Sequence, residues 1–176
     1  MSRLDSFIRR LQAQRACLNW AIEAIGTLPG PVLEIGLGNG RTYDHLRSRL
    51  GQARAIFAFD RQLAAHPACA PDRDHLVLGD FRDTLPGFAR RLRAAAALVH
   101  ADTGSGDEAA SQAQAQWLAG VVDDVLAPEG VVVSDQDMSH RDRLPPGWHT
   151  APLPPEVQPG RYFIYRKAPG PRASGR

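Results

Sequence analysis

The feature that most constrains this chain is a short apolar segment that runs directly into a turn with three alternating glycines. Positions 32–35 read Val-Leu-Glu-Ile, positions 36–40 read Gly-Leu-Gly-Asn-Gly, and residues 42–50 have a helical pattern. Glycine has no Cβ, so the backbone can turn sharply there and a ligand can approach its N–H groups beside the start of the helix. The pattern predicts a strand, a tight turn and a helix that together form a ligand site.

Further apolar segments alternate with helical ones along the rest of the chain. Residues 55–59, 76–78, 94–99 and 131–133 are predicted strands, and residues 109–126 a helix. This alternation is typical of an α/β fold with a mostly parallel sheet and right-handed crossovers. Two last strand-like segments, 148–153 and 162–165, flank a proline-rich stretch and predict a terminal antiparallel hairpin, which completes a seven-stranded sheet.

An amphipathic helix is predicted ahead of this core. Apolar residues recur at three- and four-residue spacing over residues 4–25, with arginines on the other face, and glycine and proline at 26–31 end the helix. We therefore divide the chain into this helix (1–28), packed on the core or on a partner chain, a ligand-binding domain (29–167) and a disordered Gly/Pro/Ser/Arg-rich tail (168–176). The wide apolar face favours a homo-oligomer.

Composition limits the class of protein. A chain of 176 residues with a formal charge of +2 fits one domain, and its arginines form no basic block that would indicate a nucleic-acid surface. Its two cysteines, Cys17 and Cys69, form no C-x-x-C pair, and no apolar run approaches the roughly 20 residues that span a bilayer. We expect a cytoplasmic protein without membrane insertion.

The glycine spacing excludes two common nucleotide motifs. A dinucleotide fingerprint, G-x-G-x-x-G, would need glycine where Arg41 stands, and a phosphate-binding P-loop would need a G-K-[ST] ending. An acidic residue lies inside the first strand, Glu34, and another ends the second, Asp60. The pattern indicates a ligand that carries a ribose but no pyrophosphate.

This constellation resembles the class I methyltransferases that use S-adenosylmethionine (SAM), whose first motif has the form acidic-x-G-x-G-x-G. Positions 34–40, Glu-Ile-Gly-Leu-Gly-Asn-Gly, match it. The resemblance covers about residues 31–167 and implies a Rossmann-like fold with SAM as cofactor. The leading helix and compact core are also similar to a small group of bacterial SAM-dependent methyltransferases whose acceptor is undefined.

The resemblance also implies roles for individual residues. Asp60 would accept hydrogen bonds from the ribose hydroxyls, Asp80 and Phe81 would frame the adenine, and Glu34 would hold the methionine amino group. Arg41 and Thr42, at the helix start, are candidates for the methionine carboxylate, because a helix N-terminus favours an anion. The expected cofactor-binding residues are Glu34, Gly36, Gly38, Gly40, Arg41, Thr42, Asp60, Gly79, Asp80 and Phe81.

The acceptor is less defined. Methyltransferases of exocyclic base amines and of some protein amides carry an Asn/Asp-Pro-Pro-aromatic motif after the fourth strand, but positions 100–107 contain no proline or aromatic residue. This argues against those acceptors and favours a small-molecule acceptor. Asp135-Gln136 resembles part of the metal site of small-molecule O-methyltransferases, with His100 or Asp102 as a further ligand, yet glutamine replaces the usual asparagine. We assign no metal and leave that alternative open.

Three residues are candidates for catalysis. Asp102 and Asp135 follow the fourth and fifth strands, and His140 lies in the polar loop after the fifth, where its near-neutral pKa would suit a general base. Methyl transfer needs a base only if the acceptor must lose a proton, so no signature residue is obligatory. The leading hypothesis is a SAM-dependent methyltransferase, and the alternative is a SAM-binding protein without catalysis.

Overall fold

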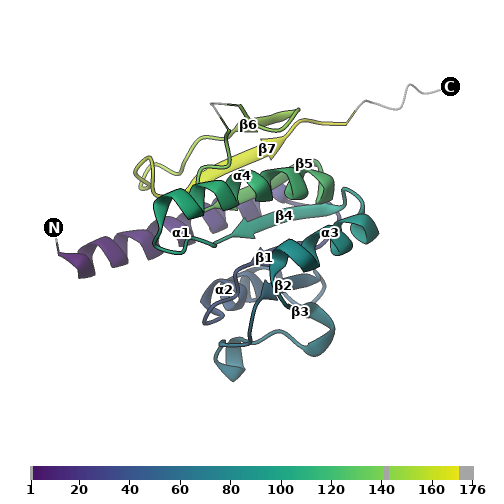
Figure 1. The fold of residues 1–176 in the computed structure, drawn as a ribbon, viewed down its shortest axis with the longest axis horizontal. Helices are drawn as coiled ribbons and strands as arrows, with labels where there is room; N and C mark the ends of the chain where they lie inside the picture. Colours follow the sequence, from purple (N-terminus) through teal and green to yellow (C-terminus); the bar gives the residue numbers. More distant parts are fainter. Residues whose placement is uncertain (1, 141–142, 171–176) are drawn as a thin grey trace.

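A seven-stranded sheet with the order β3-β2-β1-β4-β5-β7-β6 forms the centre of the protein. The computed structural model describes residues 2–140 and 143–170 (Figure 1). The sheet is parallel except that β7 runs antiparallel to β5 and β6, so the expected α/β fold with a terminal antiparallel pair is confirmed. The strands are β1 (Val32–Ile35), β2 (Ile56–Asp60), β3 (Leu76–Leu78), β4 (Ala96–Ala101), β5 (Leu126–Ser134), β6 (Trp148–Thr150) and β7 (Phe163–Lys167).

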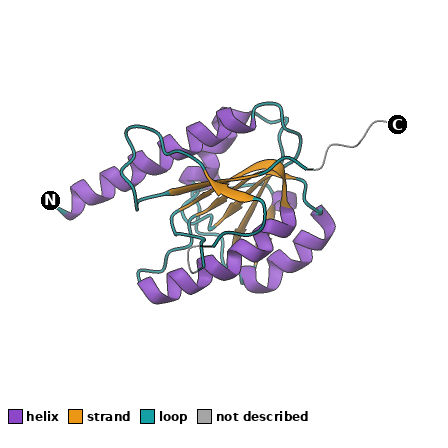
Figure 2. Ribbon diagram, turned by 90° about the horizontal axis from the view of Figure 1, so that it is seen from above, coloured by secondary structure: helices purple, strands orange, loops and turns teal. Residues whose placement is uncertain are grey.

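Helices cover both faces of this sheet, which gives three layers (Figure 2). The α-helices are α1 (Arg3–Ile25), α2 (Arg41–Leu50), α3 (Phe81–Leu92) and α4 (Glu108–Val125), and two short 3-10 helices, η1 (Pro67–Cys69) and η2 (Arg73–His75), precede β3. Successive strand residues point to opposite faces. Leu33 and Ile35 therefore pack with α3 and α4, whereas Val32 packs with α1 and α2.

The chain reverses its order in the sheet at β1, which lies between β2 and β4. In open α/β sheets, ligands bind beyond the carboxyl ends of the strands at such a switch point. Ile35 and Ala101, the last residues of β1 and β4, are direct partners in the register. The segments that follow them, the glycine turn and the loop from Asp102, are thereby brought together.

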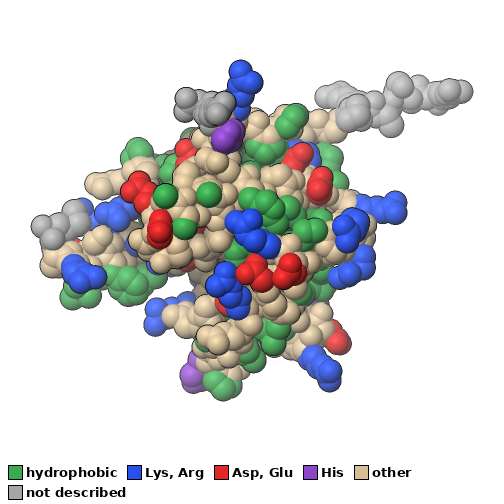
Figure 3. Space-filling view, in the orientation of Figure 1, with side chains coloured by type: hydrophobic (Ala, Val, Ile, Leu, Met, Phe, Trp, Pro, Cys, Tyr) green, Lys and Arg blue, Asp and Glu red, His purple; other side chains and the backbone are tan. Residues whose placement is uncertain are grey.

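Helix α1 packs on its own sheet for most of its length and extends beyond it at its first turns (Figure 1). Ser2 and Asp5 form a capping box at its start. Its buried residues begin at Ala13, whereas Leu4, Phe7 and Ile8 stay exposed. Hydrophobic side chains are visible on this projecting end in Figure 3.

Three elements differ from the sequence-based expectation. Strand β4 continues to Ala101, so His100 lies inside the sheet, and β5 begins at Leu126, where a helix was expected to end. Helix α3 was not expected and contains Pro86, a residue that normally interrupts helices.

Residues 171–176 of the expected disordered tail lie outside the described residues. Within the part of the chain that the structure describes, no helix combines the length and apolar character needed to cross a membrane.

The packing of α1 predicts which of its leucines matter for stability. Leu18 is 1% exposed against the sheet, and Leu4 on the same helix is 66% exposed. Leu18→Ala should lower the free energy of unfolding by about 2–5 kcal/mol, because it leaves a cavity in the core. The matched change Leu4→Ala should alter it by less than about 0.5 kcal/mol. Urea denaturation measures both, and similar losses for the two variants would contradict this packing.

Candidate functional site

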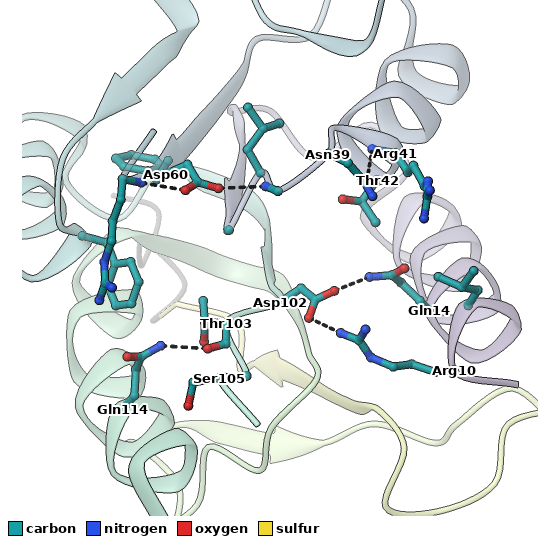
Figure 4. A pocket seen from close by; sticks show the side chains of 18 of the residues that line it. Arg10, Gln14, Asn39, Arg41, Thr42, Asp60, Asp102, Thr103, Ser105 and Gln114 are labelled. Carbon is teal, nitrogen blue, oxygen red and sulfur yellow. Dashed lines mark hydrogen bonds and ion pairs between the residues drawn. The ribbon is translucent and has the colours of Figure 1, made fainter. Parts of the chain in front are cut away.

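A cavity of about 440 Å³ lies at the carboxyl ends of β1, β2 and β4 (Figure 4). Three segments form most of its wall: one face of α1, the glycine turn, and the loop after β4. The side chains from α1 that line it are Phe7, Arg10, Leu11 and Gln14, and those of the β4 loop include Asp102, Thr103 and Ser105. The volume falls within the range of about 300–1,000 Å³ that is typical of small-molecule sites.

The three glycines of the turn have different physical roles. Gly36 has φ +91°, and a Cβ there would collide with the carbonyl oxygen of Asp102. Gly40 has φ +85°, and a Cβ there would lie 2.6 Å from the carbonyl oxygen of Cys69. Gly38 has φ +53°, but a Cβ would meet no atom within 4 Å. Gly36 and Gly40 are therefore required by the fold, and Gly38 borders the open cavity.

Most N–H groups of this turn bond within the protein. Those of Gly36 and Leu37 donate to the carbonyl of Phe59, and that of Gly40 donates to the carbonyl of Leu37. The N–H of Gly38 donates to Asp60 Oδ2 at 2.8 Å. The turn thus presents Gly38, which has no side chain, to the cavity, with Asn39 and Asp60 beside it.

Asp60 keeps the capacity to bind further donors. Its Oδ1 accepts from the N–H of Arg61 at 2.7 Å and from that of Gln62 at 3.5 Å, the outer limit of a hydrogen bond, and its Oδ2 accepts from Gly38. A carboxylate has about four acceptor positions, so Oδ2 retains one, and a ligand hydroxyl can replace the long contact at Oδ1. Asp60 lines the cavity and can accept two hydroxyl groups side by side.

The segment after β3 is divided between the cavity and helix α3. Phe81 lines the cavity and lies 6.1 Å from the ring of Trp117. Asp80 caps α3 through the N–H of Arg82 at 2.9 Å and pairs with Arg61 at 3.2 Å. Gly79, with φ +139°, and Asp80 lie outside the cavity wall.

Glu34 is completely buried and does not reach the cavity. It lies opposite His100 in the β1–β4 register and accepts from His100 Nδ1 at 2.8 Å. The hydroxyl of Thr42, at the start of α2, donates to its other oxygen. Thr42 and Arg41 line the cavity, and the backbone N–H of Arg41 bonds to the side chain of Asn39 at 3.3 Å.

His100 is buried with carboxylates nearby. Burial opposes the imidazolium, but Glu34, Asp102 and Asp135 outweigh it and raise the pKa of His100 above its ordinary value. Its ring stacks on Tyr162 at 6.3 Å, and its Nε2 has no hydrogen-bond partner among the described residues. The Glu34–His100 pair thus stabilises the contact between β1 and β4 directly beneath the cavity.

Asp102 joins α1 to the end of β4. Arg10 Nη2 donates to its Oδ1, and Gln14 Nε2 donates to its Oδ2 at 2.7 Å. The hydroxyl of Tyr162 lies 3.4 Å from the same Oδ2. Arg10 and Gln14 were not expected in the site. Their four-residue spacing places them on one face of the helix, but the pattern alone does not show that this face covers a cavity.

Asp135 and His140 lie differently. Asp135 is nearly buried and accepts from the N–H groups of Thr103 and Gly104, both at 3.1 Å, so it holds the β4 loop. Burial and the charge of Asp102 raise the pKa of Asp135. His140 is exposed, bonds through Nδ1 to Gln116 Oε1 at 2.8 Å, and lies outside the cavity wall.

The three residues named above as possible metal ligands all have partners within the protein. Asp102 is paired with Arg10, Asp135 with backbone N–H groups, and His100 with Glu34. Over residues 2–140 and 143–170, no three His, Cys, Asp or Glu side chains gather in an arrangement that could hold a metal ion.

The raised pKa of His100 predicts how stability depends on pH. A group whose pKa is higher in the folded state stabilises the fold fully below its unfolded pKa, about 6.5 for histidine, and this contribution is lost as pH rises through the folded value. The difference in unfolding free energy between wild type and His100→Gln should therefore be largest in mild acid and shrink toward alkaline pH. Denaturation at a series of pH values measures it.

The control for this series is His149→Gln, which changes an exposed histidine. Its difference from wild type should stay small at every pH. If the His100→Gln difference instead grew as pH rose, the buried imidazolium would be ruled out.

The glycine geometry predicts two unequal alanine substitutions. Gly38→Ala should cost about 1–2 kcal/mol of stability, the strain of a left-handed backbone, because the added Cβ meets no neighbour. Gly36→Ala should cost clearly more, because the same strain is joined by a collision with the backbone of Asp102. Thermal unfolding of both variants measures the difference. Equal losses would contradict the close approach of the two segments.

Over residues 1–167 the chain matches the sequence profile of a family described as S-adenosyl-L-methionine methyltransferase. It is similar to the structure of an S-adenosyl-L-methionine methyl transferase from Silicibacter pomeroyi, with 44% identity, a TM-score of 0.87 and coverage of 96% of this chain and 99% of that chain. A comparison with curated proteins finds no match.

More distant structures are similar in fold alone. TrmN from Thermus thermophilus is 17% identical, with a TM-score of 0.57 and coverage of 88% of this chain and 52% of that chain. The cofactor-bound Rv0187 protein from MTB is 18% identical, with a TM-score of 0.56 and coverage of 91% of this chain and 81% of that chain.

Proposed function

This chain belongs to the family of SAM-dependent methyltransferases, and we propose that it methylates a small-molecule acceptor in the cavity beneath α1. The observation that carries this proposal is the cover that α1 forms. Phe7, Arg10, Leu11 and Gln14 close the cavity from the helix side, and Asp102 holds two of them. A covered cavity of this size suits a cofactor with a small acceptor better than a macromolecular surface.

The residues around the cavity fit the cofactor. Gly38 leaves open space at the turn, Asp60 has a free acceptor position on Oδ2 and a long contact on Oδ1 that a ligand can replace, and Phe81 offers an aromatic wall. We propose that Asp60 binds the ribose hydroxyls and that Phe81 packs on the adenine, with Gly79 and Asp80 fixing the start of α3 behind it. Gly36, Gly40, Glu34 and Thr42 hold the turn in shape, and Arg41 stands at its edge. Bound SAM supplies an electrophilic methyl group on a sulfonium.

The protein's own contribution to methyl transfer is alignment and exclusion of water. Among the three catalytic candidates, Asp102 lines the cavity, and its carboxylate is the one that we propose contacts the bound cofactor. Asp135 supports it by fixing Thr103 and Gly104. His140 remains a weaker candidate, because it bonds to Gln116 outside the cavity.

We also propose that the protein is a homo-oligomer in the cytoplasm. The exposed apolar side chains Leu4, Phe7 and Ile8, at the end of α1 that borders the cavity, support a homo-oligomer. The free thiols of Cys17 and Cys69 support a reducing, cytoplasmic location. The near balance of charge, +2, gives no support for a nucleic-acid partner. Light scattering of the purified protein tests the oligomer, and a monomer would contradict it.

Removing the Asp60 carboxylate should lower the affinity for the cofactor. Asp60→Ala should weaken binding of S-adenosylhomocysteine by about 1.5–3 kcal/mol, the range for hydrogen bonds to a charged group. Isothermal titration measures this affinity. Asp74→Ala, which removes an exposed carboxylate elsewhere, is the control and should bind normally. Because Asp60 also bonds to Gly38, an unfolding curve must confirm that the variant is folded. Unchanged affinity would remove Asp60 from the site.

The acceptor class is tested with SAM that carries a labelled methyl group. The protein is incubated with this SAM and a cell extract, which is then separated by size into metabolites and macromolecules. The proposal predicts enzyme-dependent label among the metabolites. Label found solely in protein or nucleic acid would contradict the small-molecule assignment.

A further inference from the structure

We propose that Arg10 of α1, held by Asp102, binds the carboxylate of the cofactor's methionine end. The inference rests on the proposed function and assigns to α1 a part of the cofactor site. It differs from the sequence-based expectation, which gave this role to Arg41 and Thr42 at the start of α2.

Arg10 has donors to spare inside the cavity. It bonds to Asp102 through Nη2, and that same atom lies 4.0 Å from Asp135 Oδ2. Nε and Nη1 of Arg10 form no hydrogen bond to any described residue, and the side chain is 39% exposed while lining the cavity. A guanidinium carries five N–H donors in a planar fork that matches a carboxylate. Arg10 thus presents an unused part of that fork to a ligand.

The guanidinium is held in place before any ligand arrives. Asp102 and Asp135 fix its Nη2 side, while Gln14 and Tyr162 fix Asp102 through its other oxygen. A planar guanidinium held in this way loses less conformational entropy for each hydrogen bond that it then forms.

The Arg10–Asp102 ion pair should bind the amino acid end of the cofactor in preference to a simple anion. A lone anion would meet the negative charge of Asp102 beside Arg10. The methionine end is a zwitterion, so its carboxylate can face Arg10 while its ammonium faces Asp102. An ion pair and a zwitterion are complementary in charge.

The location is also consistent with the other end of the cofactor. Asp60 and the Arg10–Asp102 pair lie on different sides of the cavity (Figure 4). Asp102 abuts Gly36 at the start of the glycine turn, so the turn separates the two groups. Thr42, an earlier candidate, donates its hydroxyl to Glu34, so its side chain has no donor left for a carboxylate.

The test compares two ligands that differ in the amino acid end. S-adenosylhomocysteine has it, and 5′-methylthioadenosine lacks it. By isothermal titration, Arg10→Gln should weaken S-adenosylhomocysteine on the order of 10- to 100-fold, the effect of losing a charge-assisted hydrogen bond. The same variant should bind 5′-methylthioadenosine within about twofold of wild type.

Two further variants separate a role in binding from a role in holding α1. Arg9→Gln, which changes the neighbouring arginine outside the cavity wall, should bind both ligands normally, and Arg10→Lys should recover part of the lost affinity. Equal weakening of both ligands by Arg10→Gln would mean that the residue merely holds α1 in place and would overturn the inference. Unchanged affinity for both would also overturn it. A wild-type protein that bound neither ligand would overturn the proposed cofactor site as well.

Discussion

The contact between Gly36 and the backbone of Asp102 organises the site. It forms where β1 and β4, neighbours at the switch point of the sheet, end side by side. Because a side chain at position 36 would occupy the space of the Asp102 carbonyl, the glycine turn and the β4 loop can approach only through a glycine. Asp60 then fixes one side of the turn through Gly38, and Arg10 and Gln14 bring α1 over the other side through Asp102.

Beneath this contact lies a buried polar layer. Glu34 and His100 face each other across β1 and β4, where an unpaired charge would be strongly destabilising. Their pairing, with the Thr42 hydroxyl as a further donor, ties both strands to the start of α2. The motif acid is therefore bonded to β4, which leads into the β4 loop, and to the start of α2, which follows the glycine turn, even though its carboxylate is not part of the cavity wall.

Sequence patterns predicted the elements whose formation depends on neighbouring residues in the chain. The strand before the glycine turn, the turn itself and the amphipathic α1 follow from apolar periodicity and from the freedom of glycine. Helix α3 escaped prediction because Pro86 breaks the helical pattern. Strand β4 was predicted at residues 94–99, two residues before its position in the structure, because the polar His100 looked like the start of a loop. It is tolerated inside the sheet because Glu34 lies opposite.

Tertiary contacts decided what the sequence could not. A motif shows that Glu34 is acidic but not which face of the sheet it points to, and here it points to buried partners. The arginines of α1 all looked solvent-exposed, although Arg10 reaches an acid 92 positions away. Asp80 and Asp135 followed strands as expected, but their carboxylates cap a helix and hold a loop. Such roles depend on which segments meet.

A crystal structure of the protein with S-adenosylhomocysteine bound is the most direct test of the central claim, that the cavity beneath α1 is the cofactor site. We expect the ribose against Asp60, the adenine against Phe81 and the amino acid end beneath α1. A ligand seated elsewhere on the protein, or bound in this cavity with α1 displaced from Asp102, would contradict it.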